Sequence, residues 1–223
     1  MTKIIAFAGR KQSGKTTCSE FVRQVYNNAT YNVLYDRVKV ENMSKIYNFA
    51  DALKQDICIN MLDMTNEQCY GDDVAKNTLT KLRWEDMPGY DDSWRLNKDY
   101  DSSGFMTARQ VMQFVGTDIF RKMKNDIWAK ATLSKIKQEK PKLAIVADCR
   151  FPNEVEAIRD AGGIVIKLNR NPYNSDHSSE VALDDINYSN KNFHLVINND
   201  ILSIDEQNTI ILNFLIKKDM LPK

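Results

Sequence analysis

The sequence has few of the residues that build metal sites and disulfide frameworks. It contains two histidines and four cysteines, at positions 18, 58, 69 and 149, and no two cysteines form a C-x-x-C pair. Structural zinc sites and disulfide-stapled folds depend on closely spaced cysteines and histidines. We therefore expect neither, and the scattered thiols favour a reducing compartment.

An excess of charge of one sign is also missing. The chain has 31 lysines and arginines against 30 aspartates and glutamates, a formal net charge of +1. A protein whose main ligand is nucleic acid normally has a basic excess or a basic face, so nucleic acid is not expected as the main partner.

Long hydrophobic segments are missing too. No apolar run reaches the roughly 18 residues that a transmembrane helix needs, and Met1 leads into an apolar strand without a cleavage signal. We therefore expect no membrane association and predict a cytoplasmic protein.

The chain does have enough apolar material for a sizeable core. Of its 223 residues, 43% are hydrophobic and 27% charged, which is average for a globular protein of one large domain, or of one domain with an insertion. Apolar runs predict strands over residues 4–8, 143–147, 164–168 and 193–197, and a further run over 46–50 leads into a helix. Helical spacing and helix-end signals predict helices over residues 13–27, 51–61, 107–124 with more helix to 137, 153–161 and 204–216. This alternation predicts an α/β fold with a mostly parallel sheet and helices on both faces.

One stretch, residues 71–104, interrupts this pattern. It is rich in aspartate and has no clear periodicity. We interpret it as an insertion, or flap, laid over the core of a single domain that spans residues 1–223.

A phosphate-binding motif follows the first strand. Residues 9–16 read G-R-K-Q-S-G-K-T and fit G-x-x-x-x-G-K-[ST] between a buried strand and a helix. The glycines let backbone N–H groups wrap an anion, Lys15 reaches the β- and γ-phosphates, and the Thr16 hydroxyl binds Mg²⁺. The motif therefore predicts a P-loop NTPase sandwich of three layers that binds a nucleoside triphosphate. We assign the ATP site to Gly9, Gln12, Ser13, Gly14, Lys15, Thr16 and Thr17. Lys11, a second lysine of the loop, either is a solvated charge or faces a second phosphate beyond the γ-phosphate.

Two charged residues follow a later strand. Asp148 ends the apolar run 143–147, where a carboxylate holds Mg²⁺ or where an acceptor-binding residue lies, and Arg150 comes two residues later. We expect both over the same crevice and assign them, with Lys15, to catalysis.

The helix that begins at Thr107 has a polar face. Arg109, Gln113 and Gly116 are spaced by four and three residues, and Thr107 with Gln110 forms a capping box. This face either binds a planar ligand and its phosphate or is merely solvated.

A polar stretch over about 169–181 predicts a short lid over the phosphates, with Arg170 as its positive charge. It includes His177, but triad-type nucleophilic catalysis is not expected because no nucleophile elbow accompanies that histidine.

Several segments in this order resemble the bacteriophage-type deoxynucleoside monophosphate kinases, over nearly the whole chain. They are residues 9–16, the segment YNFADALK at 47–54, RQVMQFVGTD at 109–118, DCRFPNE at 148–154, HSSE at 177–180 and VINND at 196–200.

The resemblance implies an adenylate-kinase-like α/β fold, Mg²⁺ with ATP as donor, deoxynucleoside monophosphates including dGMP and dTMP as acceptors, and a homodimer. If a phage encodes the protein, it would act in the host cytoplasm. Lys15, Thr16 and Arg170 would serve the donor. On the resemblance, the acceptor would be surrounded by Lys11, Lys54, Arg109, Trp128, Asp148, Arg150 and Glu154, and the polar helix face adds Gln113 and Gly116 to the predicted acceptor ligands. Residues 71–104 do not align with the family pattern, which leaves open which bases are accepted.

Two other classes compete with this interpretation. One is another small-molecule P-loop kinase, such as a coenzyme A precursor kinase. The other is a P-loop nucleotide switch or motor. A motor would require a catalytic glutamate directly after Asp148, but the residue at that position is Cys149.

Overall fold

The computed structural model describes residues 2–33, 43–89, 103–172 and 178–221. These residues form two compact units, unit 1 (residues 1–49 and 129–223) and unit 2 (residues 50–128). The expectation of a single domain with a 71–104 insertion and a 169–181 lid stays a prediction. Residues 90–102 and 173–177 of those segments, His177 among them, lie outside the described residues.

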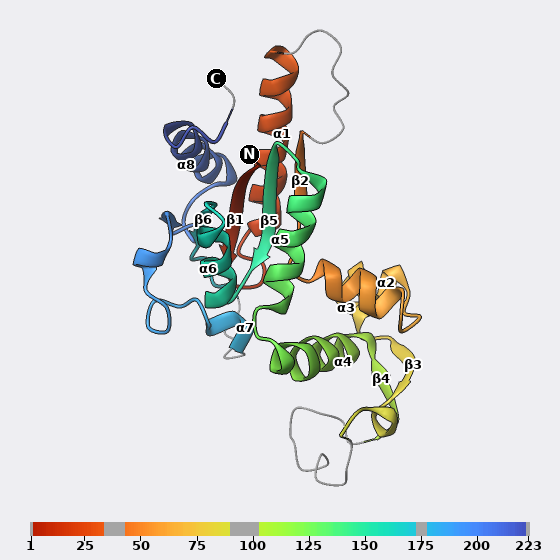
Figure 1. Ribbon diagram of the computed structural model, residues 1–223. Helices are drawn as coiled ribbons and strands as arrows, with labels where there is room; N and C mark the ends of the chain where they lie inside the picture. The colour runs from red at the N-terminus through yellow and green to blue at the C-terminus, as the bar shows by residue number, and fades with distance from the viewer. Residues whose placement is uncertain (1, 34–42, 90–102, 173–177, 222–223) are drawn as a thin grey trace. The chain divides into compact units, whose positions relative to one another are not determined.

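Unit 1 is built on a five-stranded sheet in the order β2-β5-β1-β6-β7, in which every neighbouring pair of strands is parallel (Figure 1). The strands are β1 (Lys3–Gly9), β2 (Ser44–Tyr47), β5 (Leu143–Cys149), β6 (Ile164–Leu168) and β7 (Leu195–Ile197). The continuous apolar runs of β1, β5 and β6 are buried along almost their whole length, which is typical of strands covered on both faces.

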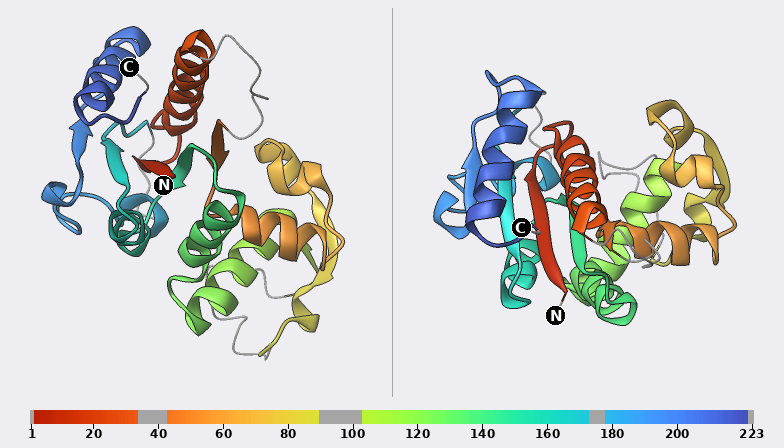
Figure 2. Two further views of the ribbon diagram at one scale, coloured as in Figure 1. Left: turned by 45° about the horizontal axis from the view of Figure 1, so that its top comes forward. Right: turned by 90° about the horizontal axis from the view of Figure 1, so that it is seen from above.

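Helices cover both faces of this sheet. They are α1 (Lys15–Val33), α5 (Ile127–Glu139), α6 (Pro152–Asp160) and α8 (Ile204–Lys217). The unit also contains the shorter helices α7 (Ser178–Val181) and η5 (Asn190–Asn192). Figure 2, left, shows the sheet edge-on with α1 and α8 on one face and α5 and α6 on the other. On one face of the sheet, Ile5 and Phe7 of β1 share a hydrophobic cluster with residues of α1 and α8. On the other face, Ile4 of the same strand lies close to Gly163, just after α6. The predicted three-layer α/β sandwich is therefore confirmed.

The phosphate-binding motif follows β1, which is the strand from which the chain builds the sheet outward on both sides. β5 and β2 lie on one side of β1, and β6 and β7 lie on the other. In open parallel sheets, ligands bind at the carboxyl ends of strands at such a switch point.

Unit 2 contains helices and a two-stranded antiparallel sheet. Its elements are η1 (Ala52–Ile59), α2 (Asn66–Tyr70), α3 (Asp73–Lys76), β3 (Leu79–Arg83), η2 (Trp84–Asp86), β4 (Phe105–Thr107), α4 (Ala108–Gln113) and η4 (Phe114–Arg121). Its core includes Trp84, Met106 and Phe114, and the rings of Trp84 and Phe114 meet edge-on at 5.8 Å. Part of the 71–104 segment, which we expected to lack regular structure, therefore forms α3, β3 and η2.

Most predicted elements are confirmed with shifted ends. The helix predicted over 13–27 begins at Lys15 and runs to Val33, and the strand predicted over 193–197 spans only Leu195–Ile197. The Thr107–Gln110 capping box is present, and Gly162 follows α6 with a φ of 75°, as the predicted helix end requires. The segments 52–59 and 114–121 wind as π-helices, which the α-helical spacing did not predict. Among the described residues, no helix has the length and apolar character needed to cross a membrane.

Candidate active site

Three residues of the loop after β1 have a positive φ, and two of them are glycines. Gly9 has a φ of 144°, and a Cβ atom at this position would lie 2.5 Å from the carbonyl oxygen of Leu168. Gln12 and Gly14 also have positive φ values, 57° and 100°. These turns carry the chain from β1 into α1, so that the loop lies at the amino end of that helix, which favours anions.

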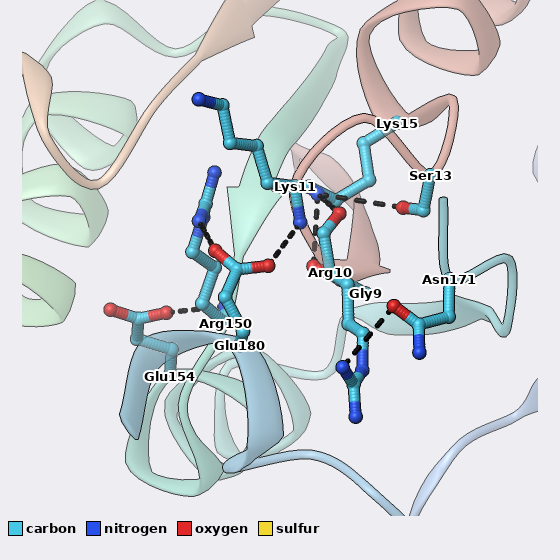
Figure 3. A network of polar contacts seen from close by, with 9 residues as sticks. All are labelled: Gly9, Arg10, Lys11, Ser13, Lys15, Arg150, Glu154, Asn171 and Glu180. Carbon is cyan, nitrogen blue, oxygen red and sulfur yellow. Dashed lines mark hydrogen bonds and ion pairs between the residues drawn. The ribbon is translucent and has the colours of Figure 1, made fainter. Parts of the chain in front are cut away.

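Lys15 lies inside the loop, not in solvent. Its Nζ donates to the carbonyl oxygens of Gly9 at 2.9 Å and Arg10 at 2.5 Å, and the residue is only 6% exposed (Figure 3). Burial, and then the positive charge of Arg150, lower the pKa of this ammonium to about 8, while the carboxylates of Glu180 and Asp148 act in the opposite direction. A buried cation under a glycine loop is suited to charge neutralisation of a triphosphate.

The other loop residues assigned to ATP have different surroundings. Ser13 is fully buried, whereas Gln12, Thr16 and Thr17 are exposed, the two threonines on the first turn of α1. Arg170 follows β6 and is exposed, and its backbone N–H donates to the side chain of Asn199.

Asn199 connects the loop to α8. Its Nδ2 donates to the carbonyl oxygen of Ser13 at 2.9 Å and to Oε1 of Gln207 at 2.6 Å, and its Oδ1 accepts from the N–H of Arg170 at 3.0 Å. Gln207 in turn donates to the Cys18 thiol on α1. Asn199, Gln207 and Cys18 are all buried. This network holds the phosphate loop in place, and our assignment of site residues missed it.

The end of β5 carries Asp148 and Arg150 beside the loop. Oδ1 of Asp148 accepts a hydrogen bond of 2.7 Å from the backbone N–H of Phe49, at the end of neighbouring β2. Glu154 lies in the first turn of α6, is 2% exposed, and accepts from the backbone N–H groups of Arg150 at 2.8 Å and Phe151 at 3.1 Å. Glu154 thus fixes the backbone from which the Arg150 side chain projects.

Glu180 reaches this group from α7. One of its carboxylate oxygens accepts from the backbone N–H of Lys11 at 2.5 Å, and the other accepts from Nη1 of Arg150 at 2.5 Å. Figure 3 shows the carboxylate between the loop and the end of β5. A small cavity next to it is lined by Gly9, Arg150, Glu180 and Asp184, among others. The sequence indicates Glu180 only as part of the HSSE segment, because its partners lie 30 and 169 positions away in the chain.

The remaining predicted acceptor ligands belong to unit 2. Arg109 pairs with Asp73 at 2.7 Å, and its Nε donates to Asn77 at 3.1 Å. The ammonium of Lys54 lies 4.7 Å from the centre of the Tyr70 ring.

Gly116 and Trp128 lie in the interior of unit 2. The Trp128 indole N–H donates to the carbonyl oxygen of Gly116, and a Cβ atom on Gly116 would lie 2.6 Å from Leu53. Gln113, in contrast, is exposed. The expectation that Arg109, Gln113 and Gly116 share one non-core face is therefore wrong for Gly116. The chain changes from α- to π-helical winding at Phe114, which alters the spacing of the faces.

The structure thus groups the predicted residues by unit. Unit 1 brings the phosphate loop together with Asp148, Arg150 and Glu154, to which Glu180 and Asn199 are added. Unit 2 holds Lys54, Arg109, Gln113, Gly116 and Trp128. A glycine loop with a buried lysine between β1 and α1 of a parallel sheet defines a P-loop nucleotide-binding protein.

Comparison with known proteins places the chain within that class. A family model described as deoxynucleotide monophosphate kinase matches residues 92–209, more than half of the chain. The chain belongs to the deoxynucleotide monophosphate kinase family, as the sequence resemblance predicted, and it is a phosphotransferase.

Curated relatives agree with this family. The chain is 28% identical over 213 residues to a putative deoxynucleotide monophosphate kinase of Acanthamoeba polyphaga mimivirus, with 88% of each chain covered. It is 30% identical over 89 residues to the deoxynucleoside-5'-monophosphate kinase of Escherichia phage T5, covering 35% of this chain and 36% of that protein. Among solved structures, shikimate kinase from Acinetobacter baumannii, in complex with shikimate, matches with a TM-score of 0.45 and 11% identity, over 98% of this chain and 95% of that chain. A coenzyme A precursor kinase and a nucleotide switch, the two alternatives from sequence, are not supported.

Proposed function

We propose that this kinase transfers the γ-phosphoryl group of Mg·ATP to a deoxynucleoside 5'-monophosphate, yielding ADP and a deoxynucleoside diphosphate. The observation that carries the proposal is the buried Lys15 ammonium, held inside a glycine loop whose neighbour is the Arg150 guanidinium. Phosphoryl transfer depends on positioning and on neutralising the charge of the phosphoryl oxygens, and two cations from different elements supply this.

The donor side of the proposed site is the loop itself. We propose that the backbone of Gly9 to Gly14 wraps the triphosphate, that Lys15 contacts its β- and γ-phosphates, and that Arg170 approaches them from the segment after β6. Lys15 exchanges its bonds to two carbonyl oxygens for bonds to phosphate oxygens of full negative charge, which are stronger.

Mg²⁺ would arrive with ATP as part of the substrate. Thr16 offers an exposed hydroxyl on the first turn of α1, and Asp148 offers a carboxylate at the end of β5, whose last residue Cys149 pairs with Ala8 of β1. Hydroxyl and carboxylate oxygens are the hard ligands that Mg²⁺ prefers, and Mg²⁺ usually takes only one or two carboxylates besides phosphates and water. The residues therefore fit the ion, which when bound would neutralise charge on the phosphates.

We propose that the acceptor nucleotide is bound in unit 1 by Lys11, Asp148, Arg150 and Glu154. The planar guanidinium of Arg150 suits bidentate binding of a phosphate, and Glu154 holds its backbone in place. Lys54, Arg109 and Trp128 of unit 2 stay predicted acceptor ligands on the family resemblance, and Gln113 and Gly116 stay so on their helix spacing alone. Gly116 and Trp128 also serve the packing of that unit.

Two further expectations belong to this proposal. One is that the protein acts in a reducing cytoplasm, where the four buried cysteines would stay thiols. The homodimer implied by the resemblance stays a prediction, which sedimentation of the purified protein would test.

The proposal is tested by measuring ADP formation from Mg·ATP with a panel of acceptors: the four deoxynucleoside monophosphates, dTMP included, their ribonucleotide counterparts, and thymidine. We expect turnover with at least one deoxynucleoside monophosphate and little or none with thymidine, because the cations of the site suit a dianionic phosphate. Efficient turnover of thymidine, or none with every monophosphate, would contradict the proposal.

A further inference from the structure

The Glu180 carboxylate occupies an anion-binding position of the phosphate loop. Its two oxygens accept from the backbone N–H of Lys11 and from the guanidinium of Arg150, each at 2.5 Å (Figure 3). A backbone N–H of a glycine-rich loop and an arginine fork are the donors that bind phosphate in proteins. Here a carboxylate of the same chain holds both donors at once.

The carboxylate is largely withdrawn from solvent. The Glu180 side chain is 12% exposed and that of Arg150 is 30% exposed, so water screens this ion pair only partly. Glu180 is also close enough to Lys15 to act on its charge, since Glu180 is one of the groups that raise the pKa of Lys15. Three positive or positively polarised groups of the loop region therefore surround one acidic side chain.

A second ion pair anchors the segment that carries Glu180. Arg10 donates to both carboxylate oxygens of Asp184, at 3.2 Å from Nε and 2.5 Å from Nη2, and its Nη1 donates to Asn171 at 3.2 Å. The backbone N–H of Asp184 donates to Val181, the last residue of α7. The segment after Glu180 thus stays tied to the loop when the Glu180 charge is removed, which makes substitutions of Glu180 interpretable.

We propose that Glu180 sets the nucleotide affinity of this kinase by competing with a nucleotide phosphate for the Lys11 N–H and the Arg150 guanidinium. The inference rests on the proposed function, because it takes the loop and Arg150 to be phosphate ligands. A phosphate that enters must displace the carboxylate. The apparent dissociation constant therefore equals the intrinsic one divided by the fraction of time for which Glu180 leaves the position open.

Glu180→Gln and Glu180→Ala test this competition. Glutamine keeps the shape but removes the charge, and its single amide oxygen can accept from Lys11 or from Arg150 but not replace both carboxylate oxygens, because its amide nitrogen is a donor. Alanine removes the acceptor atoms altogether. We expect both variants to bind the competing nucleotide about tenfold more tightly than wild type, a change of about 1.4 kcal/mol. The matched control is Glu156→Gln, which removes an exposed carboxylate on α6 and should leave affinity unchanged.

Calorimetric titrations with Mg·ATP, dGMP and dTMP, each alone, identify the phosphate that competes. Tightening for the monophosphates only would identify the acceptor phosphate, and tightening for Mg·ATP only would identify a donor phosphate; either result supports the proposal. In steady-state assays the KM of the same nucleotide should fall while kcat changes less.

Two results would overturn the proposal. Unchanged affinity for all three nucleotides in folded variants would show that Glu180 does not compete. Weaker binding with a lower kcat would show that Glu180 instead positions Arg150 for substrate. Failure of the proposed function has a different signature, namely that neither wild type nor the variants bind any of the nucleotides.

Discussion

Replacing Asn199 with alanine removes the side chain that holds the phosphate loop against α8. Three hydrogen bonds are lost, to the carbonyl oxygen of Ser13, to Oε1 of Gln207 and from the N–H of Arg170. Ser13 is fully buried and Gln207 is 6% exposed, so water does not readily replace the lost partner.

The magnitude follows from these three bonds. An intramolecular hydrogen bond contributes roughly 1 kcal/mol net, and a buried group left without its partner costs about 1–3 kcal/mol. We therefore expect Asn199→Ala to lower the free energy of unfolding by about 3 kcal/mol. For a chain of this length about 2–4 °C is lost for each kcal/mol, so Tm should fall by roughly 6–12 °C.

The neighbouring residue provides a matched control. Asn198 is exposed, and its side chain accepts one hydrogen bond from Asn169. Asn198→Ala should change stability by no more than about 0.5 kcal/mol, as surface substitutions usually do. Thermal unfolding of both variants measures the loss of stability. Titration with Mg·ATP measures the ATP affinity, which should fall in Asn199→Ala because the phosphate loop is no longer held in place. The same Tm for both variants would refute the role of Asn199, as would unaltered ATP affinity in Asn199→Ala.

Three further predictions concern the cations of the site. The pKa of Lys15 in the free enzyme is lowered to about 8, and its charge is needed for binding, so kcat/KM for ATP should fall as pH rises through about 8. The value of kcat should persist to higher pH, because bound phosphate favours the charged form of Lys15. A kcat/KM that stays flat to about pH 9.5 would contradict this prediction. Arg150→Lys keeps the charge but loses the planar fork, so kcat/KM for the acceptor should fall about tenfold in steady-state assays; a change confined to the ATP parameters would assign Arg150 to the donor. Arg109→Ala should weaken binding of deoxynucleoside monophosphates and spare ATP in calorimetric titration, with less than about 1 kcal/mol lost in stability because its ion pair with Asp73 is partly exposed. Asp73→Ala breaks the same pair and leaves the arginine in place, so equal loss of acceptor affinity in both variants would reduce Arg109 to a structural role.

Much of unit 1 could be predicted because its signals are local. The strands β1, β5 and β6 are continuous apolar runs, and the phosphate loop needs its glycines within a short stretch between strand and helix. Gly9 is required by the approach of the Leu168 carbonyl oxygen, and Gly14 by its positive φ. Such local constraints leave a direct mark on the sequence.

The contacts that were missed are formed between distant parts of the chain. Glu180 lies 169 residues after Lys11, and apart from its place in the HSSE segment nothing in the nearby sequence distinguishes it from a solvated lid residue. Asn199 could have been found by the rule that identified Asp148, because it also follows a buried strand, β7, at the carboxyl edge of the sheet. Polar residues just beyond every strand of a parallel sheet deserve the same weight.

The faces of the π-helical segments could not be predicted either. Apolar spacing predicts helix positions with a period of 3.6 residues, whereas the segments 52–59 and 114–121 wind more widely. Gly116 is consequently packed against Leu53 although the α-helical period places it beside Gln113 on the solvent face. The winding depends on packing within unit 2, which the sequence period does not record.

The central claim is that Lys15 in the loop of unit 1 drives phosphoryl transfer from ATP to a deoxynucleoside monophosphate. The most direct test is the rate of dGDP or dTDP formation by Lys15→Ala, with the exposed Lys142→Ala as control for loss of a lysine. Loss of an electrostatic donor to the transition state lowers kcat by about 10²–10³-fold, so we expect a loss of this size in Lys15→Ala and wild-type turnover in Lys142→Ala. Wild-type turnover in a folded Lys15→Ala protein would contradict the account.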